Sequence, residues 1–430
     1  MRKLFSFITF TLILSFSYTV LPQSDGSNNI PDKRECSTMD VFDRLKSEDP
    51  NYENRLREIE EQIQEYIKNN GQDHVVVTIP VVVHVVYKTS AQNISDAQVQ
   101  TQLNVLNEDF RKLNADRNLV PAPFQPLHAD CEINFCLAVR DPNGNPTNGI
   151  TRTQTTKKSF RTNDDVKFTS RGGKDAWPRD SYLNIWVCDL FRGYLGYAQF
   201  PGGNAATDGI VVDYKAFGTI GTATYPFNKG RTATHEVGHW LNLRHIWGDD
   251  GTSCLGTDFV SDTPNQADEN YGCPPFPSIS CSNGPNGDMW MDYMDYTDDR
   301  CMYMFSNGQS SRMNAILNGT RISLLTSNGC VPVNAPGIQL TMNNFILEQN
   351  YPNPFNPVTV IHFSLPGNTN VTLNIYDVTG RLIRTLINGE IRSAGRNSVE
   401  FDGSDLSSGI YIYRLEADSF VEIKKMLLIK

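Results

Sequence analysis

The chain has 430 residues, 48 of them acidic and 38 basic, so that its formal net charge is −10. This length exceeds that of one ordinary domain and predicts two or three. The acidic balance argues against nucleic acid or an anionic membrane surface as the partner.

The first 23 residues have the pattern of a secretory signal peptide. Arg2 and Lys3 are followed by an apolar stretch from Leu4 to Leu21 and then by polar residues, an order that is typical of such peptides. A membrane anchor is the alternative, because the apolar stretch is close to the shortest length that spans a bilayer. Since an exported protein meets oxidising conditions, we expect disulfide bonds among the nine cysteines.

Residues 24–74 are polar and charged, and we interpret them as a propeptide. One helical stretch is expected near Val41–Asn69. Cys36 lies alone in this segment, ahead of every other cysteine. An upstream thiolate can occupy the open position of an active-site metal and keep an enzyme latent, which makes Cys36 a candidate zymogen switch. The alternative is an unpaired thiol in a dispensable segment.

Residues 75–332 are expected to form a domain of mixed α and β structure. The nearly continuous β-branched run Val75–Tyr87 predicts a strand that is buried on both faces. Ser95–Asn114 is predicted to be a helix, with Ser95 as its N-cap and apolar residues at three- and four-residue steps. Three further strands are predicted, at Glu132–Arg140, Leu183–Leu190 and Gly209–Val212.

The eleven residues from His235 to His245 carry the strongest functional signal. On a helix, residues four apart share a face, so His235 and His239 can direct their imidazoles at one metal ion. Glu236 is placed to take a proton from an attacking water. His245 can join them only if the helix ends and the chain folds back. Three neutral imidazoles with an open fourth position make a catalytic zinc site, whereas structural sites are closed by four protein ligands. The alternative is a helix whose histidines bind no metal.

This segment, His-Glu-Val-Gly-His-Trp-Leu-Asn-Leu-Arg-His, resembles the zinc-binding motif of the metzincin metallopeptidases, and Asp292–Tyr296 resembles their methionine-containing turn. Together with Asp262-Thr263-Pro264, the likeness is to the pappalysin (cytophagalysin, M43) group and covers about Val75–Cys330. It implies a zinc endopeptidase with an α+β fold, whose upper α/β subdomain is a twisted sheet backed by a helix above the zinc helix. In such an enzyme Met294 is the hydrophobic floor under the zinc, and Tyr296 is a phenol that stabilises the oxyanion.

Asn242 stands where the family has its helix-ending glycine. The turn there requires a positive φ, which Asn tolerates better than other non-glycine residues, so we expect the chain to bend and keep the zinc geometry. The implied reaction is peptide hydrolysis, with Glu236 as the base and Tyr296 beside the oxyanion. One alternative is a catalytically silent surface or binding protein, although no ligand or base has been lost. A zinc hydrolase acting on non-peptide bonds is the other, and the sequence carries no mark of it.

Two further features of the cleft are expected. Asp298 and Asp299 follow the methionine turn, near the place where metzincins form the pocket for the residue after the scissile bond. We prefer Asp299, because a disulfide at Cys301 would fix its position, and a buried carboxylate there favours Arg or Lys in the substrate. Solvated loop acids are the alternative. The glycine-rich segment Gly193–Gly203 is the candidate edge strand that pairs with an extended substrate in this family.

The loop between the zinc helix and the methionine turn combines acidic residues with cysteines. Its polar candidates for a cation are Asp249, Asp250, Asp258, Asp262, Thr263, Asp268 and Glu269. Clustered oxygens suit Ca²⁺, and the family resemblance implies structural calcium, with Asp258, Asp262 and Thr263 as the favoured ligands. A solvated acidic loop is the alternative.

Cysteine pairing is only partly constrained. Four cysteines lie between the zinc helix and just beyond the methionine turn, and sequence alone leaves three pairings open. The pappalysin resemblance favours Cys254 with Cys281 and Cys273 with Cys301. Cys136 and Cys188 lie in strand-like runs and either pair with each other or remain buried thiols. A zinc site made of cysteines is a further alternative, but the C-x-x-C spacing is missing.

Residues 333–345 are expected to be a linker, and residues 346–430 a small all-β sandwich. Short alternating runs separated by turn signals predict six strands, at Val358–Leu365, Val371–Val378, Leu382–Ile387, Ser398–Phe401, Ile410–Leu415 and Glu422–Ile429. The block resembles the type A C-terminal sorting domain of type IX secretion, through Asn350–Phe355, Tyr376–Gly380, Leu406–Tyr411 and Lys424–Lys430.

This second resemblance implies a partner and a location. The partner is the secretion machinery of the outer membrane, and the protein is then secreted from, or held on the surface of, a Gram-negative bacterium after passing through the periplasm. The alternative is a sandwich module that binds carbohydrate or protein.

Overall fold

The computed structural model describes residues 31–70, 76–333, 346–347, 350, 353–365, 367–393, 395–418 and 420–430. The expected signal peptide (1–23) and nearly all of the expected linker (333–345) lie outside these residues. The chain divides into two compact units, residues 1–333 and residues 334–430. In the described ranges no helix is both long and apolar enough to span a bilayer.

The N-terminal segment contains two helices, α1 (Thr38–Glu48) and α2 (Tyr52–Asn70), where one helical stretch was predicted. The break falls at Asp49, which is extended with φ −128° and ψ 100°. Pro50 explains it, because the residue before a proline is disfavoured in the α region. Ile59 and Ile63 of α2 are buried in the main core of this unit. The segment therefore packs as an integral layer on the domain.

The first unit is built on a six-stranded sheet in the order β2-β1-β4-β6-β5, with β3 also pairing with β1. Its strands are β1 (Val77–Tyr87), β2 (Ile133–Leu137), β3 (Ile150–Gln154), β4 (Leu183–Cys188), β5 (Gly196–Ala198) and β6 (Ile210–Asp213). All pairs are parallel except β5 with β6. β1 is buried on both faces, as predicted, and β5 lies at the edge of the sheet.

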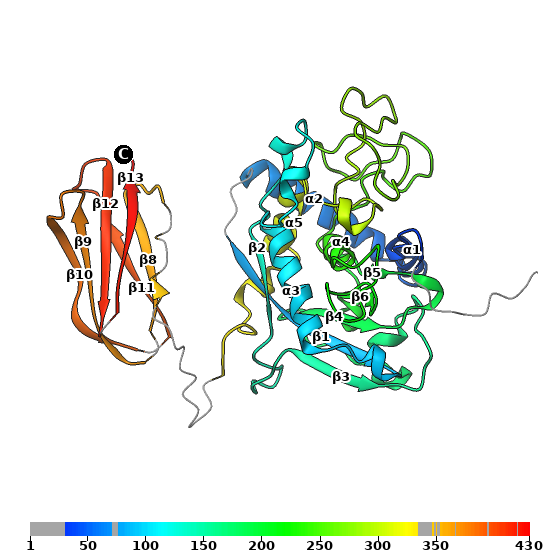
Figure 1. Cartoon of the computed structure of the whole chain (residues 1–430), viewed down its shortest axis with the longest axis horizontal. Helices are drawn as coiled ribbons and strands as arrows, with labels where there is room; N and C mark the ends of the chain where they lie inside the picture. The colour runs from blue at the N-terminus through cyan, green and yellow to red at the C-terminus, as the bar shows by residue number, and fades with distance from the viewer. Residues whose placement is uncertain are drawn as a thin grey trace, which may run out of the picture. The chain divides into compact units, whose positions relative to one another are not determined.

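Helices α3 (Asp96–Phe110) and α4 (Arg231–Trp240) cover one face of the sheet (Figure 1). Helix α5 (Asn307–Asn318) contributes apolar side chains to the same core. The Ser95 side chain accepts a hydrogen bond from the Gln98 backbone N–H, which confirms the predicted N-cap of α3. Apolar side chains of α3 and α4 join those of the sheet in one core. This core fixes α4 beneath the edge strand β5.

Three disulfides are present: Cys136–Cys330, Cys254–Cys281 and Cys273–Cys301. The last two are the pairs that the resemblance implied. For Cys136 both predicted alternatives are wrong, because it is bonded to Cys330, whereas Cys188 is a buried free thiol. β2 and β4 flank β1 on opposite sides, so they are about 9.6 Å apart, beyond the reach of a disulfide.

The second unit is a β-sandwich of two antiparallel sheets, in the orders β10-β9-β12-β13 and β11-β8-β7. The strands are β7 (Ile346–Leu347), β8 (Val358–Leu365), β9 (Thr369–Asp377), β10 (Leu382–Arg392), β11 (Gly395–Asp402), β12 (Gly409–Ala417) and β13 (Phe420–Leu428). All six predicted strands are present. Their inward residues form a separate core, as expected for a sandwich.

Candidate active site

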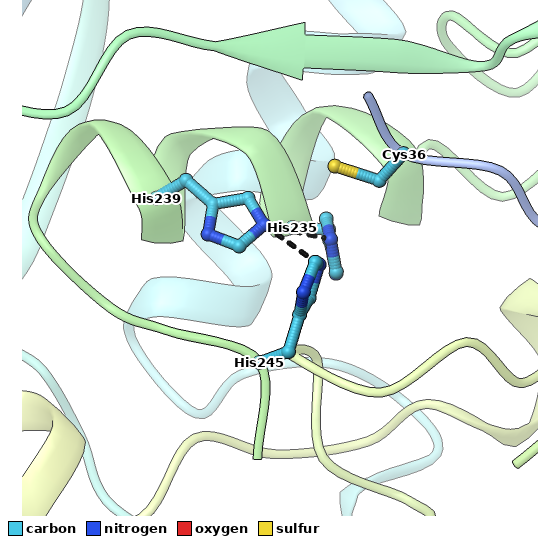
Figure 2. A group of neighbouring side chains, drawn as sticks. All are labelled: Cys36, His235, His239 and His245. Atoms are coloured by element: carbon cyan, nitrogen blue, oxygen red, sulfur yellow. Dashed lines mark hydrogen bonds between the residues drawn. The ribbon is translucent and has the colours of Figure 1, made fainter. Parts of the chain in front are cut away.

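Helix α4 carries the histidine motif, and every residue of it is buried. His235 and His239 lie on one face, with their Nε2 atoms 3.1 Å apart. Asn242 adopts φ 71°, which confirms the predicted left-handed turn. The chain then folds back and places His245 Nε2 3.1 Å from His239 Nε2. Figure 2 shows the three imidazoles gathered at one point.

Each imidazole is oriented by an acceptor at its other nitrogen. His235 Nδ1 donates to the Tyr293 carbonyl at 2.7 Å, and His239 Nδ1 donates to the Leu243 carbonyl at 2.8 Å. His245 Nδ1 lies 2.6 Å from Asp249 Oδ1. Because carbonyl and carboxylate oxygens accept hydrogen bonds, the proton of each imidazole sits on Nδ1 and the Nε2 lone pairs are free to bind a metal. Asp249, which the sequence placed among the calcium candidates, orients a histidine instead.

The methionine turn lies directly under α4. A Cβ at Gly238 would come within 2.5 Å of Met294 Sδ, so the absence of a side chain at Gly238 allows this close approach. The Tyr296 ring packs against the imidazoles, 5.0 Å from His245 and 5.8 Å from His235 between centroids. Its hydroxyl donates to the Cys36 carbonyl at 3.2 Å.

Glu236, which follows His235 on α4, has a side chain that is 1% exposed. Burial raises the pKa of its carboxyl group to about 8. Its Oε2 accepts a hydrogen bond from Thr38 Oγ1 at 3.0 Å and lies 3.5 Å from Cys36 Sγ. Among the described residues its Oε1 has no partner. The carboxylate thus lies between the imidazoles and the N-terminal segment.

Cys36 lies against the histidine cluster. Its Sγ and one nitrogen of each of the three imidazoles all lie within 4.8 Å of one another, and Figure 2 shows the sulfur directed toward the imidazoles. Within the residues that the structure describes, this is the one group of three or more His, Cys, Asp or Glu side chains gathered closely enough to share a metal. Burial raises the pKa of the thiol.

The N-terminal segment also adds backbone to the sheet. The Leu195 N–H donates to the Glu35 carbonyl at 3.0 Å, and the Ser37 N–H donates to the Gly196 carbonyl at 3.1 Å. Cys36 bridges Gly196 in the parallel sense. The glycine-rich segment is therefore the edge strand that the sequence predicted, and in this structure its pairing groups are occupied by the N-terminal segment.

Asp299 forms a buried ion pair with Arg34 of the N-terminal segment. Arg34 Nη2 is 2.7 Å from Asp299 Oδ1, and the side chains are 1% and 0% exposed. Arg34 also donates to Thr232 Oγ1 at 3.0 Å, while Asp299 Oδ2 accepts from the Lys229 N–H at 2.7 Å. Asp298, the other candidate, instead lies 3.5 Å from the exposed Arg300. Nothing in the sequence pattern marked Arg34.

The proposed calcium ligands make other contacts. Thr263 Oγ1 donates to Asp258 Oδ2 at 2.7 Å. Asp262 accepts from Ser306 Oγ at 2.7 Å and from the Gly308 N–H at 2.9 Å, at the start of α5, where a helix N-terminus favours a carboxylate. Both carboxylates are thus satisfied by protein donors, and calcium stays a prediction.

Two family sequence patterns match the chain. The peptidase M43 pattern, described as pregnancy-associated plasma protein-A, matches residues 166–318, and a secretion-system C-terminal sorting domain matches residues 349–430. An extracellular metalloprotease of Arthroderma benhamiae is 33% identical over 243 residues, which cover 55% of this chain and 76% of the relative. One of Pyricularia oryzae is 34% identical over 250 residues, which cover 56% and 75%.

The chain is also similar to solved structures of metallopeptidases. A promirolysin mutant of Tannerella forsythia is 48% identical, with a TM-score of 0.65, over 70% of this chain and all of that one. Mature mirolysin of Tannerella forsythia in complex with a cleaved peptide is 53% identical, with a TM-score of 0.60, over 61% and 100%. The chain therefore belongs to the M43 (pappalysin) family of metallopeptidases and ends in a secretion-system sorting domain.

Proposed function

We propose that this chain is a secreted zinc endopeptidase that is made as a latent precursor and prefers Arg or Lys directly after the scissile bond. The observation that carries the proposal is the convergence of three imidazole Nε2 atoms, neighbours at 3.1 Å, beside the carboxylate of Glu236. The silent binding protein is not favoured, because all three ligands and the base are in place.

The residues at this point fit zinc. Tetrahedral coordination with Zn–N bonds of about 2.0–2.1 Å separates two nitrogen ligands by roughly 3.3 Å, close to the observed spacing. His235, His239 and His245 would hold the ion, with their Nδ1 atoms already paired to acceptors. A bound zinc ion supplies a Lewis acid and lowers the pKa of water.

The chain's own groups supply the remaining chemistry. Glu236 takes the proton of the attacking water and passes it to the leaving amine. The Tyr296 hydroxyl, which already donates to a carbonyl oxygen of the chain, donates to the oxyanion of the scissile carbonyl. Met294 packs under α4 and keeps the histidine-bearing turn in position.

Latency is proposed to arise because the N-terminal segment fills the cleft. Cys36 lies where the open metal position is expected, and Thr38 holds the carboxylate of the base. Glu35 and Ser37 occupy backbone groups of the edge strand, which an extended substrate would need. Substrate can bind only after this segment leaves.

The preference for a basic residue is supported by the Arg34–Asp299 pair. A guanidinium is bound there by a buried carboxylate, which is the chemistry that a substrate Arg or Lys would need. The pocket lies at the N-terminal end of α4, because the Asp299 carboxylate accepts from the backbone of Lys229 and Arg231.

Asp299→Ala is expected to lower kcat/KM for peptides with Arg after the scissile bond by about 100-fold, because a buried charge that loses its partner costs about 2–5 kcal/mol. Asp298→Asn is the matched control, since this carboxylate faces the exposed Arg300. Digestion of a peptide library by the activated protein, read by mass spectrometry, measures both. A basic preference that survives in Asp299→Ala would refute the pocket.

Asp249→Asn is expected to weaken zinc binding by about 10- to 100-fold, the usual effect of losing the partner of a ligating histidine. Asp250→Asn is the control, because its carboxylate accepts from the loop backbone at Leu255 and Gly256. Titration with a chromophoric chelator measures affinity without relying on turnover. Equal affinities for the two variants would show that the Asp249 contact does not tune the site.

The decisive assay for the function combines activity, metal dependence and specificity. The activated chain is incubated with a peptide library, with and without a chelator, and the products are identified. We expect cleavage before Arg or Lys that stops with the chelator and returns with zinc.

Thermal unfolding measured with and without Ca²⁺ tests the proposed calcium site, where Ca²⁺ is expected to raise the stability of the protein. Export by a type IX system of a Gram-negative bacterium is proposed from the C-terminal domain alone.

A further inference from the structure

A second charged region lies at the end of α4 opposite to Asp299. Arg244 follows α4 and its guanidinium lies between two rings, 4.4 Å from the centroid of Phe42 and 4.1 Å from that of Phe200. Phe200 in turn packs on the ligand His239, 5.4 Å between centroids. Within the described ranges no carboxylate forms an ion pair with Arg244. A cation thus lies beside the histidine cluster, where Asp249 and Glu60 attract it but, among the described residues, form no ion pair with it.

Arg312 of α5 faces the same region, and its contacts indicate which kind of side chain this region binds. Its guanidinium holds Glu60 of α2 in a bidentate pair, with distances of 2.9 and 2.8 Å. The Arg312 side chain is 1% exposed, whereas Glu60 is 27% exposed. A planar guanidinium that binds both oxygens of one carboxylate is the geometry of specific acid recognition. The N-terminal segment therefore supplies an acid to this site, just as it supplies Arg34 to Asp299.

A cavity of about 300 Å³ connects the two arginines. On the side of the catalytic domain its lining is Asn242, Arg244, Phe259 and Arg312, and the rest of the lining comes from α1 and α2. When the N-terminal segment leaves, Arg312 loses Glu60 and Arg244 loses the ring of Phe42. The residues that line the cavity from the catalytic domain then include two cations and no carboxylate.

We propose that Arg244 and Arg312 form a second substrate subsite of the mature peptidase, which binds an acidic side chain on the peptide before the scissile bond. The two sites lie at opposite ends of α4, with Asp299 at its N-terminal end. Because the Asp299 site is proposed to bind the residue after the scissile bond, this region would bind a residue before that bond. The inference rests on the proposed function. It adds that good substrates carry an acidic residue before the scissile bond and a basic residue directly after it.

The test uses the full chain after activation, with removal of the N-terminal segment checked by mass spectrometry. Peptides share one Arg after the cut, and Glu or Gln is placed in turn at each upstream position. We expect one position at which Glu gives about 10-fold higher kcat/KM than Gln, the gain of one charge-assisted hydrogen-bonded pair. This ratio should fall toward one in Arg312→Gln, and Arg244→Gln gives a second reading if Arg312→Gln does not fold.

Glu60→Gln is the matched control, since it changes the covering segment and leaves the mature surface intact. Its activated form should keep the wild-type Glu-to-Gln ratio. Higher salt should lower the ratio, because screening weakens pairs that solvent reaches. If wild type cleaves the Glu and Gln peptides equally at every position, the subsite is refuted while the peptidase stands. If no chelator-sensitive cleavage occurs at all, the proposed function itself fails.

Discussion

Glu236→Gln is expected to lower turnover by about 10²–10⁴-fold while leaving the metal bound, because the loss is that of a general base. Gln has nearly the same shape and cannot take a proton from the attacking water. Among the described residues, the buried carboxylate makes hydrogen bonds only to Thr38 and Cys36 of the N-terminal segment, so the catalytic domain itself loses no such bond. The variant should therefore fold and bind zinc as the wild type does.

The comparison requires activated protein, since the precursor is proposed to be latent. Wild type and Glu236→Gln are freed of the N-terminal segment by the same added protease, and kcat and metal content are measured on the same samples. Full zinc content with little turnover would support the assignment. Turnover close to that of wild type would show that another group takes the proton.

Cys36→Ala is expected to shorten the latent state of the precursor, because it removes the sulfur that faces the three imidazoles. The other contacts of the segment remain, including Arg34 with Asp299 and Glu60 with Arg312. We therefore expect faster conversion to active enzyme and not full activity at time zero. Arg34→Ala should act in the same direction through a different contact, and the double variant should convert fastest.

A spectroscopic measurement separates ligation from simple packing. In the inactive Glu236→Gln background, cobalt in place of zinc should show a sulfur-to-metal charge-transfer band that Cys36→Ala removes. Conversion is followed by cleavage of a quenched peptide and by sequencing of new N-termini. Equal conversion rates in Cys36→Ala and wild type, together with no sulfur band, would refute the switch.

The sequence predicted those features that depend on local periodicity. The β-branched run of β1 and the Ser95 cap are each set by neighbouring residues, and both are confirmed. The left-handed turn at Asn242, which the family resemblance implied, is confirmed as well. The spacing of His235 and His239 on one helix turn is local too. The prediction of one helical stretch over Val41–Asn69 is wrong, although its cause is local, since Pro50 disfavours helix at Asp49.

Features that join distant segments were not readable in the same way. Arg34 meets Asp299 across 265 positions of the chain, and nothing near Arg34 marks it as a pocket residue. Cys136 and Cys330 are separated by 194 positions, and cysteine spacing alone does not choose a partner. The sequence predicts Asp249 only as one of several loop acids, because the fold of the turn after His245 decides which carboxylate contacts the imidazole.

Metal content is the most direct test of the central claim, that the three histidines hold one catalytic zinc. Elemental analysis of purified, activated protein should find one zinc per chain, and His239→Ala should lose the zinc and the activity together. Protein that cleaves peptides without a stoichiometric transition metal, or a His239→Ala variant that keeps its zinc, would contradict the account.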